Sequence, residues 1–338
     1  MSDFVLQQNS ICDFATSDSW VILSPIEQSI KKKIETVGTP LKDWDINIYR
    51  GVLTGCNEAF IIDTAKRDEI LANCQSDEER EKTVELIRPI LRGRDIKRYG
   101  YDWANLYLIA TFPSCHYDIE LYPAVKKYLL SFAYGYLVEN GNKDIAINHL
   151  ADFCKQKLAQ TGQHIIINGK FVLDAKNNKE KGRKKTSNKW FETQDSISYW
   201  EDFFEPKVMW KIIGCNINFC FDESQFICNN AVDIMVGRKD RLIQFVGLMN
   251  SKLFDWYLKL TTEAEVQGGG IQLYVTTLEK TLLKLDFPQY LTDIVYQRIQ
   301  NKTSDKVVDK AVFEAYGLTP EEQSFILLDR RVNRNRET

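Results

Sequence analysis

The sequence has few of the residues that build metal sites. Its 338 residues include three histidines and eight cysteines, and no two cysteines are spaced as a CxxC pair. A structural zinc site needs cysteine or histidine ligands at short, paired spacings. We therefore expect free thiols, as in a reducing cytoplasm, and no metal site in this chain.

Long apolar segments are also missing. No run approaches the roughly 18 apolar residues that a membrane span needs. The start, Met1-Ser2-Asp3-Phe4, has neither the basic residues nor the apolar stretch of a signal peptide. With 44% hydrophobic and 27% charged residues, the composition is typical of a globular protein. We expect a cytoplasmic protein with no membrane partner.

The net charge of −3 shows no excess of one sign, but the charges are unevenly distributed. Residues 170–189 carry eight lysines and arginines against two acids, and 88–98 carry five against Asp95 alone. A protein that binds a polyanion needs a positive face and not a positive total charge. The sequence therefore allows a nucleic-acid partner.

Helix and strand patterns occur without regular alternation. Ser24-Pro25 with Glu27 predicts a capped helix that Gly38 ends, and Thr319-Pro320 with Glu322 predicts another. Short strand-like segments follow Ile46 and Val208, a continuous helix is predicted from Arg241 to Leu260, and Asn168-Gly169 predicts a hairpin. The pattern favours a mixed α+β fold with largely antiparallel strands, inserted helices and a helical C-terminal tail.

We expect three parts along the chain. Residues 1–19 read as an irregular lead-in, 20–290 as the main domain and 291–338 as the helical tail. Within the main domain we expect a helical insertion at about 119–160 and a flexible basic loop at about 174–189.

Five segments, in order, resemble the TaqI-like C-terminal specificity domain of adenine-specific DNA methyltransferases and type IIG restriction enzymes. They lie within residues 20–328 and include the runs Ile-Tyr-Arg-Gly-Val-Leu-Thr-Gly and Arg-Pro-Ile-Leu-Arg-Gly-Arg-Asp-Ile-Lys-Arg-Tyr. The segments are 48–62, 87–99, 189–194 followed by 206–208, 248–253 and 308–319.

The resemblance implies sequence-specific recognition of double-stranded DNA beside a methyltransferase that takes an adenine out of the duplex. The Asn/Asp-Pro-Pro-Tyr/Phe motif of such methyltransferases and their glycine-rich loop for S-adenosylmethionine are absent, and no Walker motif follows Gly268-Gly269-Gly270. We therefore expect no catalysis and no cofactor in this chain. S-adenosylmethionine and magnesium would belong to a catalytic part elsewhere.

The segment around Gly93 is the first candidate DNA contact. Arginine side chains match phosphate oxygens or the O6/N7 edge of guanine, and glycine permits close approach of the backbone. A solvated basic turn in which Asp95 pairs with an arginine is the alternative. The candidates here are Arg92, Arg94, Lys97 and Arg98.

The basic loop is the second candidate. Lysines on a loop without apolar anchors suit the phosphate backbone, although a solubilising surface loop would have the same composition. The candidates are Lys184, Lys185 and Lys189.

Further candidates are scattered through the resembling segments. Glutamine can pair with adenine through two hydrogen bonds, although a lone glutamine is usually a surface residue. Asn57 follows a glycine turn and can equally stabilise its own backbone. These candidates are Arg50, Asn57, Gln194, Lys207 and Gln272.

We interpret the chain as a DNA-recognition module, either a separate subunit or a fragment of a longer enzyme. Its partners would be double-stranded DNA and a methyltransferase or nuclease part. The alternative is a degenerate recognition domain that only docks onto such a protein.

Overall fold

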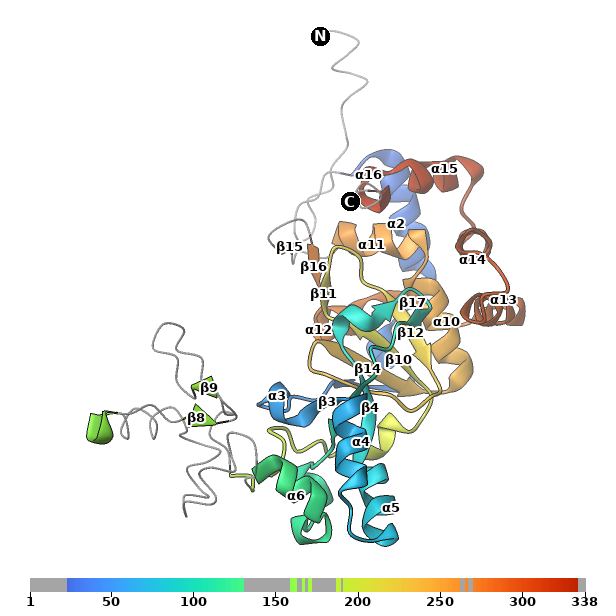
Figure 1. The fold of residues 1–338 in the computed structure, drawn as a ribbon. Coiled ribbons are helices and arrows are strands. Elements are labelled where there is room, and N and C mark those ends of the chain that lie inside the picture. The colour runs from blue at the N-terminus through green and yellow to red at the C-terminus, as the bar shows by residue number, and fades with distance from the viewer. Residues whose placement is uncertain are drawn as a thin grey trace.

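The computed structural model describes residues 23–130, 159–162, 166–167, 170–171, 187–189, 191–261, 265–266 and 270–333. It confirms a mixed α+β fold with mainly antiparallel strands and a helical C-terminus. Two four-stranded sheets form the framework, one in the upper and one in the lower part of Figure 1.

The upper sheet lies between two hydrophobic cores. Its order is β12-β10-β14-β2, and every pair is antiparallel. Side chains alternate across β10, so Val208 and Trp210 enter one core while Met209 enters the other. Both faces are therefore buried, which explains the nearly continuous apolar sequence of these strands. The strands are β2 (Ile46–Arg50), β10 (Lys207–Lys211), β12 (Phe219–Asp222) and β14 (Val232–Gly237).

The lower sheet has the order β13-β4-β7-β3, with β13 parallel to β4. The first core joins this sheet and its helices to the Met209 side of the upper sheet. The elements are α3 (Asn57–Phe60), β3 (Ile61–Asp63), α4 (Thr64–Ala72), α5 (Asp77–Leu86), β4 (Ile87–Leu91), β7 (Leu106–Ile109), α6 (Pro123–Leu130) and β13 (Ile227–Cys228).

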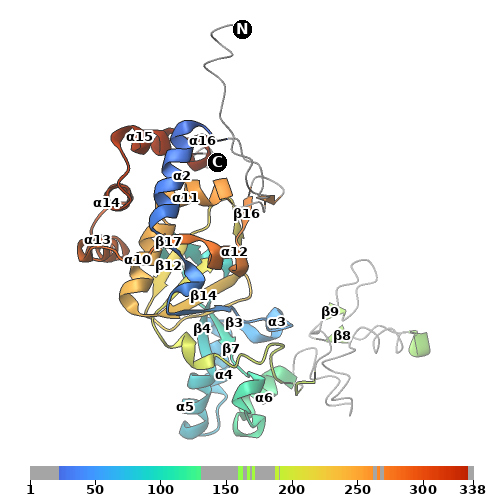
Figure 2. The same ribbon diagram turned by 180° about the vertical axis from the view of Figure 1, so that it is seen from behind.

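Helices cover the other face of the upper sheet and form the second core (Figures 1 and 2). The predicted capping boxes at Ser24 and Thr319 are confirmed. The short strands β1 (Gly38–Pro40) and β17 (Leu282–Lys284) pair with each other. This pairing joins the N-terminal part of the helical layer to its C-terminal part. The helices are α2 (Pro25–Val37), α10 (Lys239–Met249), α11 (Lys252–Thr261), α13 (Gln289–Ile299), α14 (Asp305–Ala315), α15 (Pro320–Leu328) and α16 (Arg330–Asn333).

The prediction of one helix from Arg241 to Leu260 is wrong, because the chain breaks between α10 and α11. The Asn250 side chain accepts a hydrogen bond from the Phe219 backbone N–H at 3.1 Å and donates one to its carbonyl at 2.7 Å. The Ser251 hydroxyl donates to the Leu248 carbonyl at 2.6 Å and accepts from the Phe254 N–H at 3.3 Å. These side chains compete with the helical hydrogen bonds and end the first helix.

Short hairpins complete the described fold. The predicted hairpin around residues 168–169 is confirmed by the pairing of Ile166 with Phe171, in β8 (Ile166–Ile167) and β9 (Lys170–Phe171). Residues 131–158 of the expected helical insertion lie outside the described residues. The other short elements are η2 (Gly93–Asp95), β5 (Ile96–Lys97), β6 (Gly100–Tyr101), β11 (Ile213–Gly214), β15 (Glu265–Val266), β16 (Gly270–Gln272) and α12 (Val275–Lys280).

Candidate nucleic-acid interface

The junction of the two sheets brings three distant segments together. A Cβ atom on Gly51, which follows β2, would lie 2.2 Å from the Asn229 carbonyl oxygen. A Cβ on Gly93 would lie 3.3 Å from the carbonyl oxygen of Ala231. Only glycine permits the approach at Gly51, whereas at Gly93 a Cβ would require its neighbour to move by a few tenths of an ångström. Both glycines therefore fit the strand-to-strand turn at 229–231, and the expected approach of Gly93 is to the protein's own backbone.

Arg50, Asn57 and Gln194 form a first group at this junction. Arg50 makes an ion pair with Asp195 at 3.1 Å, and the Gln194 N–H donates to the Thr54 carbonyl at 3.1 Å. The Thr54 hydroxyl donates to the Asn57 side-chain oxygen at 2.7 Å. Arg50 keeps 53% of its side chain exposed, so it can still face a ligand, whereas Asn57 stabilises its own turn.

Arg92 is committed to a contact inside the protein. Its Nε and one terminal nitrogen donate to the two carboxylate oxygens of Asp95 at 2.9 and 2.8 Å, and its backbone N–H adds a third bond at 2.8 Å. Burial alone would raise the pKa of Asp95, but these hydrogen bonds and the Arg92 charge hold it below its usual value. Arg92 therefore fixes η2.

Arg94 and Lys97 point to solvent from the same segment. Both are exposed. The Lys97 ammonium donates to the Arg94 carbonyl at 3.1 Å and lies 3.7 Å from the exposed Asp102. Within the described residues the Arg94 guanidinium has neither a hydrogen bond nor an ion pair. Asp95 pairs with Arg92, so the pairing of Asp95 with an arginine that the alternative expected is present, and it leaves Arg94 outside the pair.

Lys211, which our sequence interpretation missed, lies beside these residues. A Cβ on Gly93 would be 3.7 Å from its Cβ, and a Cβ on Gly214 would be 2.6 Å from its Cε. Burial lowers the pKa of Lys211. The nearby Cys215 opposes this shift, and the Lys97 charge adds to it. The site therefore concentrates positive charge.

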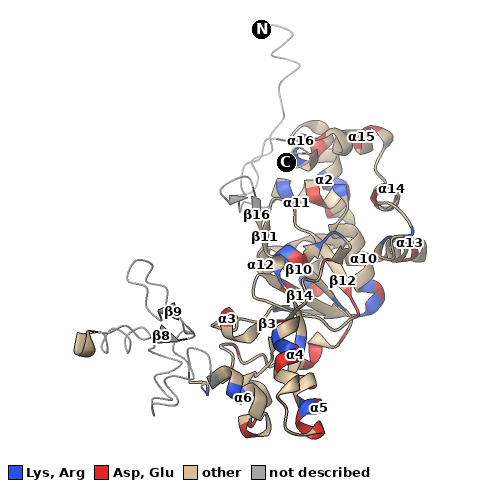
Figure 3. Cartoon of the chain, viewed as in Figure 1, with Lys and Arg blue, Asp and Glu red and all other residues tan. Residues whose placement is uncertain are grey.

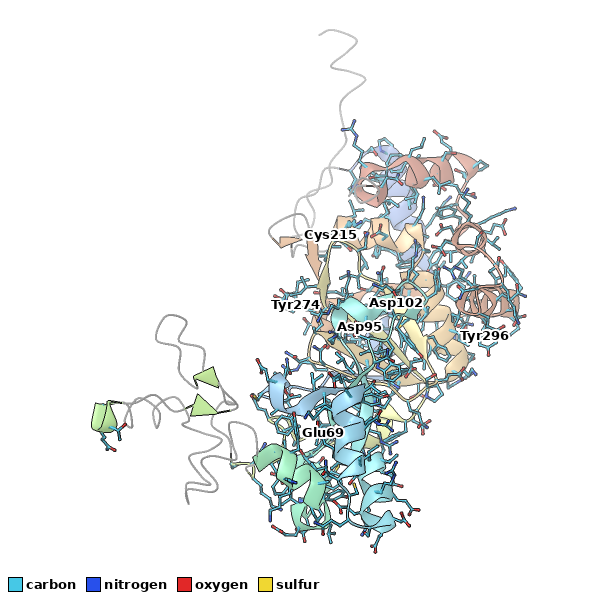
Figure 4. The ribbon with its side chains drawn as sticks, viewed as in Figure 1. Glu69, Asp95, Asp102, Cys215, Tyr274 and Tyr296 are labelled. Carbon is cyan, nitrogen blue, oxygen red and sulfur yellow. The ribbon has the colours of Figure 1, made fainter. Side chains whose placement is uncertain are left out.

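Gln272 reaches the same side of the molecule through β16. It is paired with Ile213 of β11, and Leu273 N–H donates to the Ile212 carbonyl at 2.9 Å. Ile213 is 53% exposed and Tyr274 49% exposed. Figure 4 shows Asp95, Cys215 and Tyr274 in this central region, and Figures 1 and 2 place α3, α12 and β16 opposite α13 and α14.

The prediction that Lys207 contacts DNA is wrong for this structure, because the side chain is fully buried. Its ammonium makes an ion pair with Asp222 at 2.6 Å and donates to the Phe203 carbonyl at 2.8 Å. The Asp222 carboxylate oxygens also accept hydrogen bonds from the backbone N–H groups of Ser224 and Phe226. Lys207 is thus a structural ion-pair residue that no phosphate can reach.

Arg98 is also occupied within the fold. It donates to the Asn250 carbonyl and makes an ion pair with Asp305 at 3.2 Å. It therefore links the β5–β6 hairpin to the C-terminal helices, and its DNA contact stays a prediction without geometric support.

Of the basic loop, only residues 187–189 are among the described residues. Lys184 and Lys185 lie outside them, so their role stays a prediction. Lys189 is exposed, with its ammonium 5.6 Å from the Phe191 ring centroid.

Among the described residues, no group of three or more metal-ligating side chains comes together. In the same part of the chain, no helix is long and apolar enough to cross a membrane. The six described cysteines are free thiols.

One family model and two solved structures are similar to this chain. The family model of the TaqI-like C-terminal specificity domain matches residues 88–281. The type IIG restriction endonuclease BpuSI is similar in structure, with a TM-score of 0.52 and 12% identity over 91% of this chain. The chain spans 33% of that protein's length. The type IIL restriction-modification enzyme MmeI, solved with DNA, gives a TM-score of 0.44 at 11% identity, covering 86% of this chain and 35% of its own. Curated proteins gave no match.

Proposed function

Because the chain belongs to the family of TaqI-like C-terminal specificity domains, we propose that it recognises a specific sequence of double-stranded DNA for a restriction–modification system. The observation that carries the proposal is the surface formed by Arg94, Lys97, Lys211 and Gln272. We call it the η2–β16 surface. It joins the exposed Arg94 and Lys97 and the half-buried Lys211 to a glutamine held on a strand.

The chemistry of this surface suits both binding of the phosphate backbone and reading of the bases. Ammonium and guanidinium groups attract phosphates and release counterions. A guanidinium fork can read guanine, and a glutamine can read adenine. Arg94 extends from η2, whose backbone Arg92 and Asp95 fix through three hydrogen bonds. A side chain that extends from a fixed backbone can be held in one geometry. This favours discrimination between nucleobases over loose electrostatic binding.

Catalysis would come from another part of the system. In the sequence, the base-holding motif and the glycine-rich cofactor loop of adenine methyltransferases are absent. We therefore propose that S-adenosylmethionine and magnesium act on a methyltransferase or nuclease partner, joined covalently or as a subunit. Pure chain incubated with labelled S-adenosylmethionine, magnesium and DNA should neither transfer label nor nick the duplex. Label transfer or nicking by the pure chain would contradict this assignment.

Duplex binding tests the proposal against the docking alternative. If about five basic side chains meet phosphates, the logarithm of affinity should fall with the logarithm of salt concentration at a slope of roughly −4 to −5. Selection from randomised duplexes should then enrich one motif. No binding at low salt would leave a protein-docking module as the better account.

A further inference from the structure

Lys211 has an unusual position at the end of β10. A Cβ placed on Gly214 would lie 2.6 Å from its Cε and 2.7 Å from its Nζ. The lysine stem therefore runs directly over the backbone of Gly214, where any larger residue would displace it. Gly93 lies beside the start of the same side chain, since a Cβ there would be 3.7 Å from the Lys211 Cβ, an ordinary contact distance.

The Lys211 ammonium is half-buried and lacks an acidic partner among the described residues. Lys207, four residues earlier on the same strand, has Asp222 at 2.6 Å. A partly desolvated charge is unfavourable unless an opposite charge compensates it. Burial lowers the Lys211 pKa and the Lys97 charge adds repulsion, while the nearby Cys215 offsets part of the effect. An anion from another molecule would remove this cost.

We propose that Lys211 anchors a phosphate group of the DNA backbone, next to the base-reading Arg94. The inference rests on the proposed function and assigns a residue that neither the sequence motifs nor the comparisons single out. An ammonium is a compact charge without a planar fork, so it suits a phosphate better than one base edge. Lys211 therefore contributes affinity for all sequences and sets the position of the duplex against η2.

The test is salt-dependent binding of labelled duplexes, the selected target and an unrelated sequence, by four forms of the full chain. Lys211→Met should weaken both duplexes by roughly ten- to hundredfold at low salt and reduce the salt slope by about one unit. Lys211→Arg keeps the charge and should retain the slope. Lys302→Met is the matched control, because Lys302 is exposed between α13 and α14, on the opposite side of the fold. It should bind as the unaltered chain does.

A second variant tests position without changing charge. Gly214→Ala places a methyl group 2.6 Å from the Lys211 Cε and 2.7 Å from its Nζ, so the flexible lysine must move; the methyl also lies 3.2 Å from the Asn216 carbonyl oxygen. We expect weaker binding of both duplexes with an unfolding temperature close to that of the unaltered chain. This combination separates displacement of the ammonium from loss of the fold.

The outcomes are distinguishable. If the unaltered chain binds duplex DNA and Lys211→Met binds with the same affinity and slope, the anchor is refuted and the proposed function stands. If Lys211→Met weakens only the target and leaves the slope unchanged, Lys211 reads a base and the phosphate assignment is wrong. If the unaltered chain does not bind duplex DNA at low salt, the proposed function fails, and the anchor with it.

Discussion

Two groups of basic residues on this protein differ in what faces them. At the start of α10, Arg238 is paired with Asp240 at 2.7 Å and Arg241 with Asp286 at 3.5 Å, and Lys239 is paired with Glu223. Figure 3 shows basic and acidic residues side by side at this end of the helix. On the η2–β16 surface, Arg94 and Lys211 have no acidic partner among the described residues, and Lys97 has only the exposed Asp102 at 3.7 Å. Clustering in the sequence is therefore a weaker guide to a DNA surface than the absence of compensating acids.

The comparison leads to a rule that can be tested: paired cations stabilise the fold, and unpaired cations bind. The buried pair of Lys207 and Asp222 should show the largest effect. Lys207→Met leaves an uncompensated buried carboxylate and should lower the free energy of unfolding by about 3–5 kcal/mol. Denaturant unfolding measures this, with Lys302→Met as the exposed control. A loss below about 1 kcal/mol would contradict a structural role for the pair.

Arg92 and Arg94 sharpen the rule within one segment. Arg92→Ala removes two hydrogen bonds from the buried Asp95 and should cost about 2–4 kcal/mol of folding stability. Arg94→Ala should leave stability unchanged and cost about 1–3 kcal/mol of binding on the target, with a smaller loss on unrelated DNA. Thermal unfolding and competition binding on both variants separate the two roles. Equal losses of stability would show that the two arginines act alike.

Asp233 is the reverse case, a buried acid without an ion-pair partner in the described residues. Burial raises its pKa to about 6, against a modest opposing effect of Arg50. Because the folded-state pKa exceeds the unfolded value, this group's contribution to stability is present below about pH 4 and is lost as the pH rises through about 6.

Asp233→Asn should therefore be more stable than the unaltered chain at pH 7, by on the order of 2 kcal/mol. The difference should shrink as the pH falls from about 6 to 4. Denaturant unfolding at several pH values measures it. A difference independent of pH would show that Asp233 is not protonated more readily in the folded chain.

The paired basic residues of α10 should show the smallest effect on binding. Replacing Arg238 and Lys239 by methionine removes charges that acids already compensate, so duplex affinity should change by less than about 0.5 kcal/mol. The same binding assay that tests Lys211 measures this. A loss equal to that of Lys211→Met would break the distinction between the two surfaces.

Local chemistry made part of the fold predictable from sequence. The capping boxes at Ser24 and Thr319 act within four residues, and the short apolar strand segments follow from the burial of both faces of the sheet. The break at Asn250 was not predictable, because its partner Phe219 lies 31 positions away. Residue types near the break are compatible with one continuous helix.

The same limit applies to the candidate site. Lys207 and Lys211 lie on the same face of β10, four residues apart. Nothing in the local sequence shows that Lys207 is buried and that Lys211 lies nearer the surface. Their difference arises from Asp222 on β12, which supplies an acid only to Lys207. Sequence clustering identified Arg94 and its segment, whereas the solitary Lys211 gave no signal. Contact between Gly93 and the 229–231 turn could be found only in three dimensions.

The most direct test of sequence-specific recognition by the η2–β16 surface is selection from randomised duplex DNA, run in parallel with the unaltered chain and Arg94→Ala. We predict that the unaltered chain enriches one motif and that Arg94→Ala enriches the same motif with preference lost at one base pair. An identical motif from both proteins would remove Arg94 from base recognition. No enrichment by the unaltered chain would contradict the central claim.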